Sequence, residues 1–523
     1  MSTNRLVVIL LFASVAELPA VAELAAMTEA DKSIVMTERG PVRGTVGSNF
    51  RQFLGIPYAA PPMGKLRWAP PREHARWFTP LNATRFGNHC PQVASPFGTA
   101  SLTEDCLFLN VFTPDEEANH ESDSRLYPVM VWIHGGALTV GESDDYIPTK
   151  LVHHGVIVVT INYRLGALGF LAHPALSAES PDHISGNYGI MDEQFALKWV
   201  RRNIAAFGGN PQNVTIFGES AGGRSVFLQI ASPLAAGLFH RGIVESGAYF
   251  GLAAPTLADE ELHGQTFAAS IGCYSQTAQC LRSRSVKKII ENWGIFDSSE
   301  NVDGKVLPQS PDTAFATGQF NHVPLINGTN HDEWRFFADP ITADEYPSAV
   351  ESMVGPDAAP LVLAEYPLDT FDGPSLAVGA IGTDSIFACP ARAVDQVLST
   401  QVPTFTYEFN DTNAPEVFLP PTSFPYGAAH GSELLYLFEL TWPGELDAQQ
   451  QELSDRMISY WTQFAKVGDP NWSGLPLWRP YHATTDESLS LVPPSPGPEF
   501  EFATDHKCGF WAYLLGAHAQ PAK

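Results

Sequence analysis

The sequence predicts an α/β fold with a large, mostly parallel central sheet that is flanked by helices and interrupted by insertions. Six apolar runs rich in Val and Ile recur along the chain, at residues 127–136, 156–164, 213–218, 241–247, 323–330 and 402–410. Continuous apolar strands of this kind fit a sheet that is covered on both faces. Helical patterns lie between these runs, and strands that alternate with helices are typical of a parallel sheet.

The clearest helical pattern covers residues 192–209, DEQFALKWVRRNIAAFGG. Its apolar side chains repeat on one helical face, and Gly208 supplies a C-terminal stop. The same rules predict a helix over 453–471. The stretch from about 340 to 400 is rich in acidic residues and proline, and it indicates a helical or irregular insertion between two core strands.

The N-terminus has the pattern of a secretory signal peptide. Residues 1–22 combine a basic residue, a short apolar run and a small-residue ending, which predicts cleavage after Ala22. No later segment offers about 20 uninterrupted apolar residues, so no membrane span is expected. We therefore expect a secreted or periplasmic protein. Because no repeat or low-complexity linker interrupts the rest, residues 23–523 are expected to form a single domain.

A formal net charge of −27 at pH 7 argues against binding to nucleic acid or to anionic membrane surfaces. We expect a small-molecule substrate, and a monomer or a weak homo-oligomer. No Cys or His cluster has the spacing of a zinc site, so neither a metal nor a cofactor is predicted.

The six cysteines indicate disulfides, because an even number in an exported protein is normally paired. Sequence proximity suggests three pairs, which are Cys90–Cys106, Cys273–Cys280 and Cys389–Cys508. In the chain-entropy model the first pair would stabilise the fold by about 3 kcal/mol and the last by about 4 to 5 kcal/mol.

A serine between glycines follows the third of these apolar runs, in GESAGG at residues 218–223. The motif lies between a predicted strand and a predicted helix, which is the setting of a nucleophile elbow. Gly218 and Gly222 lack the Cβ atoms that would clash in so tight a turn, and Ser220 would project against the start of a helix. Ser220 is therefore the candidate nucleophile, and a purely structural Gly-Ser-Gly turn is the alternative.

A nucleophilic serine needs a base that takes its proton and an acid that orients the base. In folds with this elbow the chain order is serine, acid, histidine. Asp332 and Glu333 both stand at the C-terminal end of a predicted strand, and spacing does not choose between them. His430 lies in a Gly/Ala-rich loop before a helix. By chain order alone, the base could also be His482, His506 or His518.

An oxyanion hole is best built from backbone N–H groups, which need no reorganisation during the reaction. The segment WIHGGAL ends a predicted strand, and Gly135, Gly136 and Ala137 would let the backbone approach a ligand closely. An ordinary strand-ending glycine turn is the alternative interpretation.

Seven ordered blocks belong to a match that extends over nearly the whole chain after residue 22. They lie at 53–71, 104–114, 131–138, 186–211, 218–223, 328–333 and 429–434. Together they resemble the type-B carboxylesterase family of α/β-hydrolases, which includes cholinesterases and bacterial p-nitrobenzyl esterases. The resemblance implies an α/β-hydrolase fold and a serine esterase that works through an acyl-enzyme without a cofactor.

The resemblance also implies roles for single residues. It assigns the nucleophile, the acid and the base to Ser220, Glu333 and His430. The oxyanion hole would be made by the backbone amides of Gly136, Ala137 and Ala221. Glu219 resembles the family's secondary acidic residue, with either a supporting or a structural role, and the three cysteine pairs look like the family's disulfides.

The chain departs from the family pattern beside the site. Ala137 stands where many members carry a third glycine, and Arg224, Trp334 and Arg335 stand where small residues or glycine are usual. The two arginines are either salt-bridged structural residues, or one of them receives a free carboxylate on the substrate. The second interpretation would suit polyacid esters, such as the tricarballylate esters of fumonisin-type toxins.

Other functions remain open at this point. The loop between the first two cysteines is short, whereas family members with lipase activity carry a long lid there, so soluble short- or medium-chain esters are favoured over emulsified fats. A catalytically inactive, cholinesterase-like binding protein is the main alternative from another class, and an amidase or a lipase on the same fold is the second.

Overall fold

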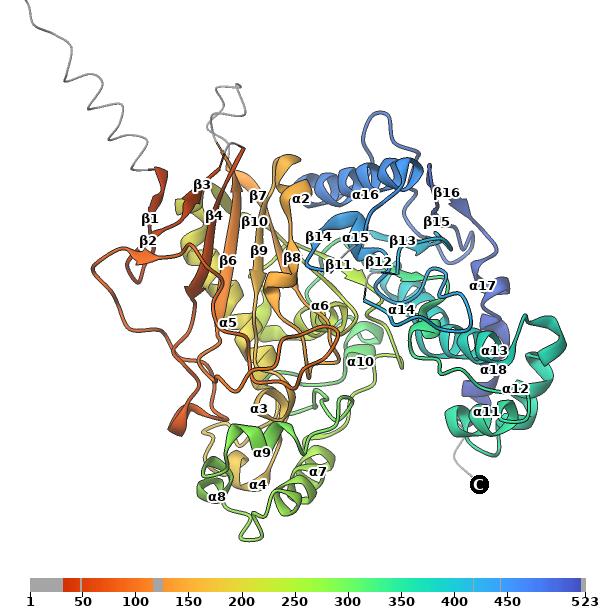
Figure 1. Cartoon of the computed structure of the whole chain (residues 1–523), viewed down its shortest axis with the longest axis horizontal. Helices are drawn as coiled ribbons and strands as arrows, with labels where there is room; N and C mark the ends of the chain where they lie inside the picture. The colour runs from red at the N-terminus through yellow and green to blue at the C-terminus, as the bar shows by residue number, and fades with distance from the viewer. Residues whose placement is uncertain (1–31, 48, 116–125, 417, 443, 519–523) are drawn as a thin grey trace, which may run out of the picture.

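The structure is a computed structural model that describes residues 32–518 except residues 48, 116–125, 417 and 443 (Figure 1). The predicted signal peptide, residues 1–22, lies outside the described residues. Among the described helices, none is long and apolar enough to cross a bilayer.

An eleven-stranded sheet runs through the molecule. In sheet order its strands are β16 (Gly497–Glu499), β15 (Ser488–Leu491), β13 (Thr404–Phe409), β12 (Leu325–Asn330), β11 (Arg241–Glu245), β10 (Gly209–Glu219), β7 (Tyr127–Ile133), β9 (Ile157–Ile161), β6 (Phe108–Pro114), β4 (Phe50–Pro57) and β3 (Thr45–Val46). All strands from β15 to β9 pair in parallel. Antiparallel strands complete both edges. The predicted α/β class is confirmed, and each of the six apolar runs supplies one parallel strand.

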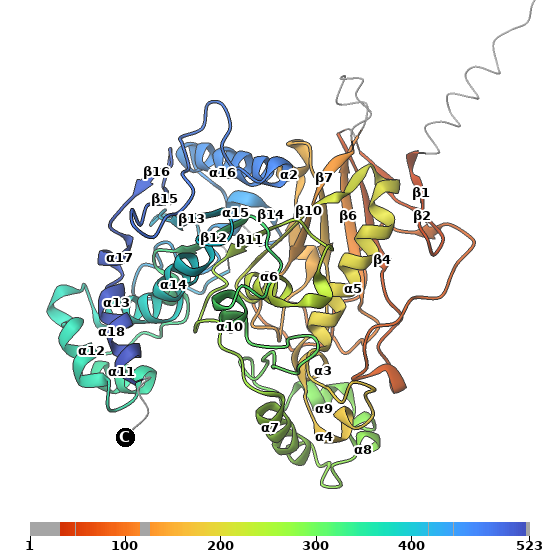
Figure 2. The same cartoon turned by 180° about the vertical axis from the view of Figure 1, so that it is seen from behind.

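Both faces of the sheet are buried, as continuous apolar strands require. On β7, Val131 belongs to the core cluster that contains apolar residues of helices α5 (Tyr188–Asn203) and α6 (Ala221–Ala231). The next residue, Trp132, belongs to the cluster that contains residues of α16 (Ala448–Val467). The view from behind in Figure 2 shows α5 and α6 on the near side.

The two predicted helices form, with shifted ends. The pattern at 192–209 continues α5 through a 3-10 turn and stops at Gly208, whose φ is +91°. The second helix begins earlier than predicted because Asp447 caps it with a capping box. It ends at Val467 rather than at 471, because Gly468 follows in the left-handed conformation.

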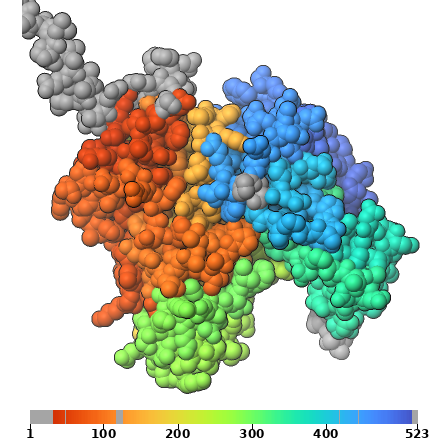
Figure 3. Space-filling model, viewed as in Figure 1, coloured from red at the N-terminus to blue at the C-terminus, as the bar shows by residue number. Residues whose placement is uncertain are grey.

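Two helical insertions project from the same end of the molecule as separate lobes (Figure 3). One follows β11 and carries α7 (Leu257–Ser270), α8 (Ala278–Arg282) and α9 (Val286–Ile290). The other is the predicted insertion between β12 and β13, and it carries α11 (Tyr346–Val354), α12 (Ala359–Glu365), α13 (Pro374–Gly382), a π-helix (Thr383–Ala388) and α14 (Cys389–Leu398).

All six cysteines are paired, and the three predicted disulfides are present. The Cys389–Cys508 bond closes the longest loop, with a sequence separation of 119, and ties the second insertion to the C-terminal helix α18 (Cys508–His518).

Candidate active site

Ser220 stands alone between the last residue of β10 and the first residue of α6. Its φ is +55° and its ψ is −122°, a conformation that is strained for a residue with a side chain. The flanking glycines are required by space, because a Cβ on Gly222 would lie 1.9 Å from the carbonyl oxygen of Ile133, and one on Gly218 would lie 2.6 Å from the same atom. The turn therefore has the form of the predicted elbow.

The segment after β7, residues 134–141, forms a tight turn that we call the oxyanion loop. Gly136 and Ala137 have φ values of +100° and +53°, and both line the same cavity as Ser220. A Cβ on Gly136 would lie 2.2 Å from the carbonyl oxygen of Val140, so only glycine fits there. Ala221 is the first residue of α6, where backbone N–H groups have no acceptor within the helix. Two of the residues proposed for the oxyanion hole thus line the same cavity as Ser220, and the third follows Ser220 in the chain.

His430 is held by Glu333. Its Nδ1 lies 2.5 Å from the Glu333 carboxylate, which is fully buried. The other oxygen of that carboxylate accepts hydrogen bonds from the Thr329 hydroxyl, at 2.7 Å, and from the Asn330 backbone N–H, at 2.8 Å. A carboxylate fixed in this way keeps the proton of neutral His430 on Nδ1 and leaves Nε2 free to act as a base.

The neighbouring carboxylate, Asp332, is directed elsewhere. It accepts from the Ala428 backbone N–H, at 3.0 Å, and pairs with the Arg335 guanidinium at 2.8 Å. Sequence spacing could not decide whether Asp332 or Glu333 orients the histidine. In the structure it is Glu333 that contacts His430. Among the alternative histidines, His482 is exposed, and His506 is buried between Asp384 and Glu408. The side chain of His518 is outside the described residues.

Glu219 faces the other side of the imidazole. One of its carboxylate oxygens lies 3.2 Å from His430 Nε2. Burial raises the pKa of Glu219 to about 7, although the charge of His430 opposes this shift. Burial lowers the pKa of His430, but the charges of Glu219 and Glu333 outweigh burial and raise it to about 9. Two carboxylates therefore stabilise an imidazolium at this position.

Replacing Glu219 with glutamine is expected to move the acidic limb of the pH–rate profile to lower pH. Imidazolium cannot act as a base, so the rate rises with pH through the pKa of His430, and removing the Glu219 charge lowers that pKa. The rate on the plateau should fall, because the same charge stabilises the imidazolium formed in the transition state. The measurement is kcat/KM for a neutral ester against pH.

Glu452→Gln is the matched control, because this glutamate is 62% exposed on α16 and should leave the profile unchanged. An acidic limb that stays in place in Glu219→Gln would show that Glu219 does not act on the base.

The elbow and the oxyanion loop open into one cavity of about 770 Å³. Its lining is strongly aromatic and includes Phe97, Tyr146, Tyr249, Phe250, Phe296, Trp334, Phe336, Phe337, Phe387, Phe418 and Trp442. The rings of Phe336, Phe337 and Phe387 lie 5.8, 5.3 and 5.0 Å from the His430 ring, so three aromatic side chains pack near the imidazole besides its two carboxylates.

Sequence reasoning missed most of this aromatic lining. Phe336 and Phe337 stand three and four residues after the candidate acid in EWRFF, and that proximity was a usable signal. Phe387 and Trp442 come from distant segments, and no local pattern connects them with the site.

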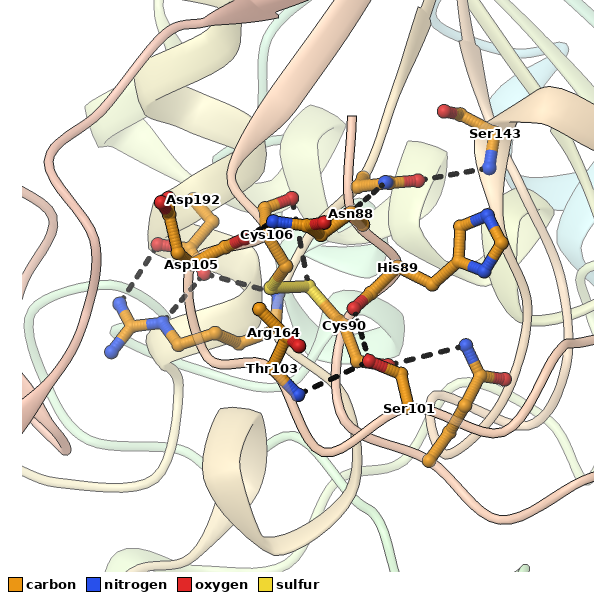
Figure 4. Close-up of a disulfide and its surroundings, with 12 residues drawn as sticks. Asn88, His89, Cys90, Ser101, Thr103, Asp105, Cys106, Ser143, Arg164 and Asp192 are labelled. Carbon is orange, nitrogen blue, oxygen red and sulfur yellow. Dashed lines mark hydrogen bonds and ion pairs between the residues drawn. A yellow bond between two sulfur atoms is a disulfide. The ribbon is translucent and has the colours of Figure 1, made fainter. Parts of the chain in front are cut away.

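The Cys90–Cys106 disulfide closes a short loop (Figure 4). Inside it, the buried Gln92 side chain pairs with both backbone groups of Gly141. Its Nε2 donates to the Gly141 carbonyl at 2.9 Å, and its Oε1 accepts from the Gly141 N–H at 2.8 Å. The end of the oxyanion loop is thus held by a second segment, and the same short loop places Phe97 in the cavity.

His89, Glu142 and Asp144 are a group of metal-ligand types within the described residues. The two nitrogens of His89 lie 3.0 and 2.9 Å from the two carboxylates. Hydrogen bonds to Asp144 and Glu142 raise the pKa of His89 to about 10. In this structure the three side chains form an ion-pair cluster.

The structure does not support the interpretation that Arg224 or Arg335 receives a substrate carboxylate. Arg224 is 7% exposed, and each of its N–H groups already has an acceptor in the protein. Arg335 pairs with Asp332 and is absent from the described lining of the cavity. The salt-bridged interpretation is therefore the one the structure supports. Trp334 does line the cavity.

A serine elbow on a mostly parallel sheet, in one cavity with a histidine that a carboxylate orients, is the arrangement of an α/β-hydrolase. Residues 31–511 match the Carboxylesterase family, and the chain belongs to that family. The resemblance found in the sequence is confirmed, and the protein is a carboxylic ester hydrolase.

Relatives occur in bacteria and in mammals. The para-nitrobenzyl esterase of Bacillus subtilis is 36% identical over 488 residues, which cover 88% of this chain and 94% of the relative. The acylcarnitine hydrolase of Mus musculus is 34% identical over 534 residues, with 93% and 92% covered. The fumonisin B1 esterase of Sphingopyxis macrogoltabida is 34% identical over 473 residues, with 86% and 84% covered.

Proposed function

We propose that this carboxylesterase hydrolyses neutral esters with bulky apolar groups, using Ser220 as nucleophile, His430 as base and Glu333 as the orienting acid. The contact of 2.5 Å between His430 Nδ1 and Glu333 carries this proposal. It fixes the useful tautomer of a histidine that lines the same cavity as the elbow serine.

The reaction follows from these positions. The Ser220 hydroxyl oxygen attacks the ester carbonyl carbon while His430 Nε2 takes its proton. The oxyanion that forms is stabilised by the backbone N–H groups of Gly136, Ala137 and Ala221. The C–O bond to the alcohol then breaks, and the alcohol leaves with the proton from His430. Water, deprotonated by His430, then attacks the acyl-enzyme. The C–O bond to Ser220 breaks, His430 returns the proton to the serine oxygen, and the carboxylic acid is released.

The cavity favours neutral substrates. Among its described lining residues, Arg224 is the one permanently cationic side chain, and its donors are all occupied. Glu219 and Glu300 also line the cavity, so a substrate carboxylate would be buried among apolar rings and acidic side chains, and His430 must be neutral to act as the base. The hypothesis of an acidic acyl group, of the tricarballylate or fumonisin type, therefore receives no support from this cavity.

A panel of 4-nitrophenyl esters with one leaving group tests the substrate class. We expect kcat/KM for the butyrate and the benzoate to exceed that for the hemisuccinate by at least about tenfold, because the extra carboxylate loses its hydration without gaining a partner. An equal or faster hemisuccinate would contradict this proposal and restore the acidic-ester hypothesis. A 4-nitroanilide and an emulsified triglyceride in the same panel test the amidase and lipase alternatives.

We also propose that the protein is exported, to the periplasm or out of the cell, and works as a single domain over residues 23–523 that is monomeric or weakly associated. Three disulfides support an oxidising compartment.

A further inference from the structure

Arg224 connects α6, the helix that follows the nucleophile, to two segments of the cavity wall, residues 249–253 and the segment that contains Glu300. Its Nη1 donates to the carbonyls of Tyr249, at 3.1 Å, and Gly251, at 2.7 Å, and its Nη2 donates to the carbonyl of Ala253 at 3.1 Å. Its Nε and Nη2 both donate to one oxygen of Glu300, at 2.9 and 2.5 Å. One guanidinium thus uses its N–H groups to hold residues 249–253 and Glu300 together.

The backbone of Arg224 is hydrogen-bonded directly to the elbow. The backbone N–H of Arg224 donates to the Ser220 carbonyl at 2.8 Å, so the arginine belongs to the first turn after the elbow. Arg224 and Glu300 are 7% and 2% exposed, and the guanidinium also lies over the Tyr249 ring, 5.3 Å from its centroid. A buried carboxylate and three carbonyls would lose their partner together if the guanidinium were removed.

Residues 249–253 need such support. Phe250 has a φ of +55° and Gly251 a φ of +70°, and a phenylalanine in the left-handed region is held there only by its surroundings. A second tie is the Phe250 backbone N–H, which donates to the Ile386 carbonyl at 2.9 Å. The conformation that these bonds impose leaves the Phe250 side chain 68% exposed although it lines the cavity.

The segment that contains Glu300 presents a second exposed ring. Phe296 lines the cavity and is 71% exposed, and its neighbour Ile295 is 43% exposed. Large apolar side chains that are exposed at the mouth of an apolar cavity are suited to bind a hydrophobic group that extends out of it.

We propose that Arg224 is a positioning residue for substrate size. It holds residues 249–253 and 295–300 as one wall of the cavity, and the rings of Phe250 and Phe296 on that wall bind the bulky apolar group of the ester. This inference rests on the proposed function and specifies its substrate class as neutral esters with aryl or alicyclic groups.

The test compares Arg224→Ala and Arg224→Lys with the wild type on 4-nitrophenyl acetate and 4-nitrophenyl 1-naphthoate. We expect kcat/KM for the naphthoate to fall about 10- to 100-fold, mainly through KM, with a much smaller change for the acetate, because only the bulky group needs the wall. Lysine should not rescue selectivity, since one ammonium cannot reproduce the planar fork of a guanidinium.

Two further variants keep the inference testable if Arg224→Ala does not fold. Phe250→Ala and Phe296→Ala remove exposed rings and should lower the ratio of naphthoate to acetate kcat/KM by about tenfold, without lowering the midpoint of thermal unfolding. Arg479→Ala, which breaks an exposed ion pair with Glu487, is the matched control and should leave the ratio unchanged.

Equal losses on both esters in the Arg224 variants, or an unchanged ratio in both phenylalanine variants, would overturn the inference. Ser220→Ala separates this failure from failure of the proposed function. If Ser220→Ala abolishes hydrolysis while the ratio is insensitive to Arg224, the serine mechanism stands and the role of the wall is wrong.

Discussion

Replacing Ser220 with alanine is expected to lower kcat for ester hydrolysis by about 10⁴- to 10⁶-fold. The oxyanion loop and the cavity would remain, but no oxygen would be placed at the elbow to attack the carbonyl carbon. Residual hydrolysis above the uncatalysed rate would come from substrate binding and the backbone amides alone. The measurement is steady-state hydrolysis of 4-nitrophenyl butyrate by purified protein whose thermal unfolding matches that of the wild type.

Ser225→Ala is the matched control, because Ser225 lies on the same helix but donates to Glu193 at 2.8 Å and is absent from the described lining of the cavity. Its kcat should stay within about tenfold of the wild type. An organophosphate should add covalently to Ser220, which peptide mass analysis detects. Wild-type rates in Ser220→Ala, with no adduct on this serine, would favour the non-catalytic binding protein and refute the serine mechanism.

The parallel part of the sheet was predictable because its burial leaves a signature in the sequence. The run at 156–164 begins VIVVTI, with a single polar residue in six, since strands covered on both faces have few polar positions to fill. The antiparallel strand β4 was not predicted. It is mostly buried, but Arg51, Gln52, Gly55 and Pro57 interrupt its apolar pattern, so the segment resembles an ordinary loop or turn.

The elbow and the oxyanion loop were predictable for a related reason. Both depend on glycines that tolerate no Cβ, and such positions are visible in the sequence as Gly-rich turns after strands. The choice between Asp332 and Glu333 could not be predicted from the sequence. Adjacent residues have almost the same position in the chain, and they differ in the direction of their side chains. The resemblance suggested Glu333, and the geometry supports it through the contact with His430.

Arg224 shows what a local departure from a family pattern can and cannot reveal. Its unusual position was visible, but its partners are backbone carbonyls at 249–253, and carbonyls have no sequence signature. A charged residue beside a nucleophile suggested a charged substrate. The structure shows that the charge is neutralised within the protein by Glu300. The aromatic lining of the cavity then becomes the main indication of substrate class.

Replacing Glu333 with glutamine is expected to lower kcat by about 10⁴-fold, whereas Asp332→Asn should lower it by less than about tenfold. In Glu333→Gln the carbonyl oxygen of the new amide would accept from Thr329 and Asn330, as the carboxylate oxygen does now, so the NH₂ group would face His430 Nδ1. Nδ1 would then accept a hydrogen bond, and the imidazole proton would move to Nε2. A protonated Nε2 cannot take the proton of Ser220, so the base would be held in the wrong tautomer.

The same exchange of oxygen for nitrogen at Asp332 removes an ion pair with Arg335 but leaves the tautomer of His430 unchanged. Asp332→Asn is therefore a control for charge and for chain position together. Both variants should be compared by kcat for 4-nitrophenyl butyrate and by the midpoint of thermal unfolding, so that a loss of folding is not counted as a loss of catalysis. If Asp332→Asn lost as much activity as Glu333→Gln at unchanged folding, the orienting acid could not be assigned to Glu333, because of these two carboxylates only Glu333 contacts the imidazole.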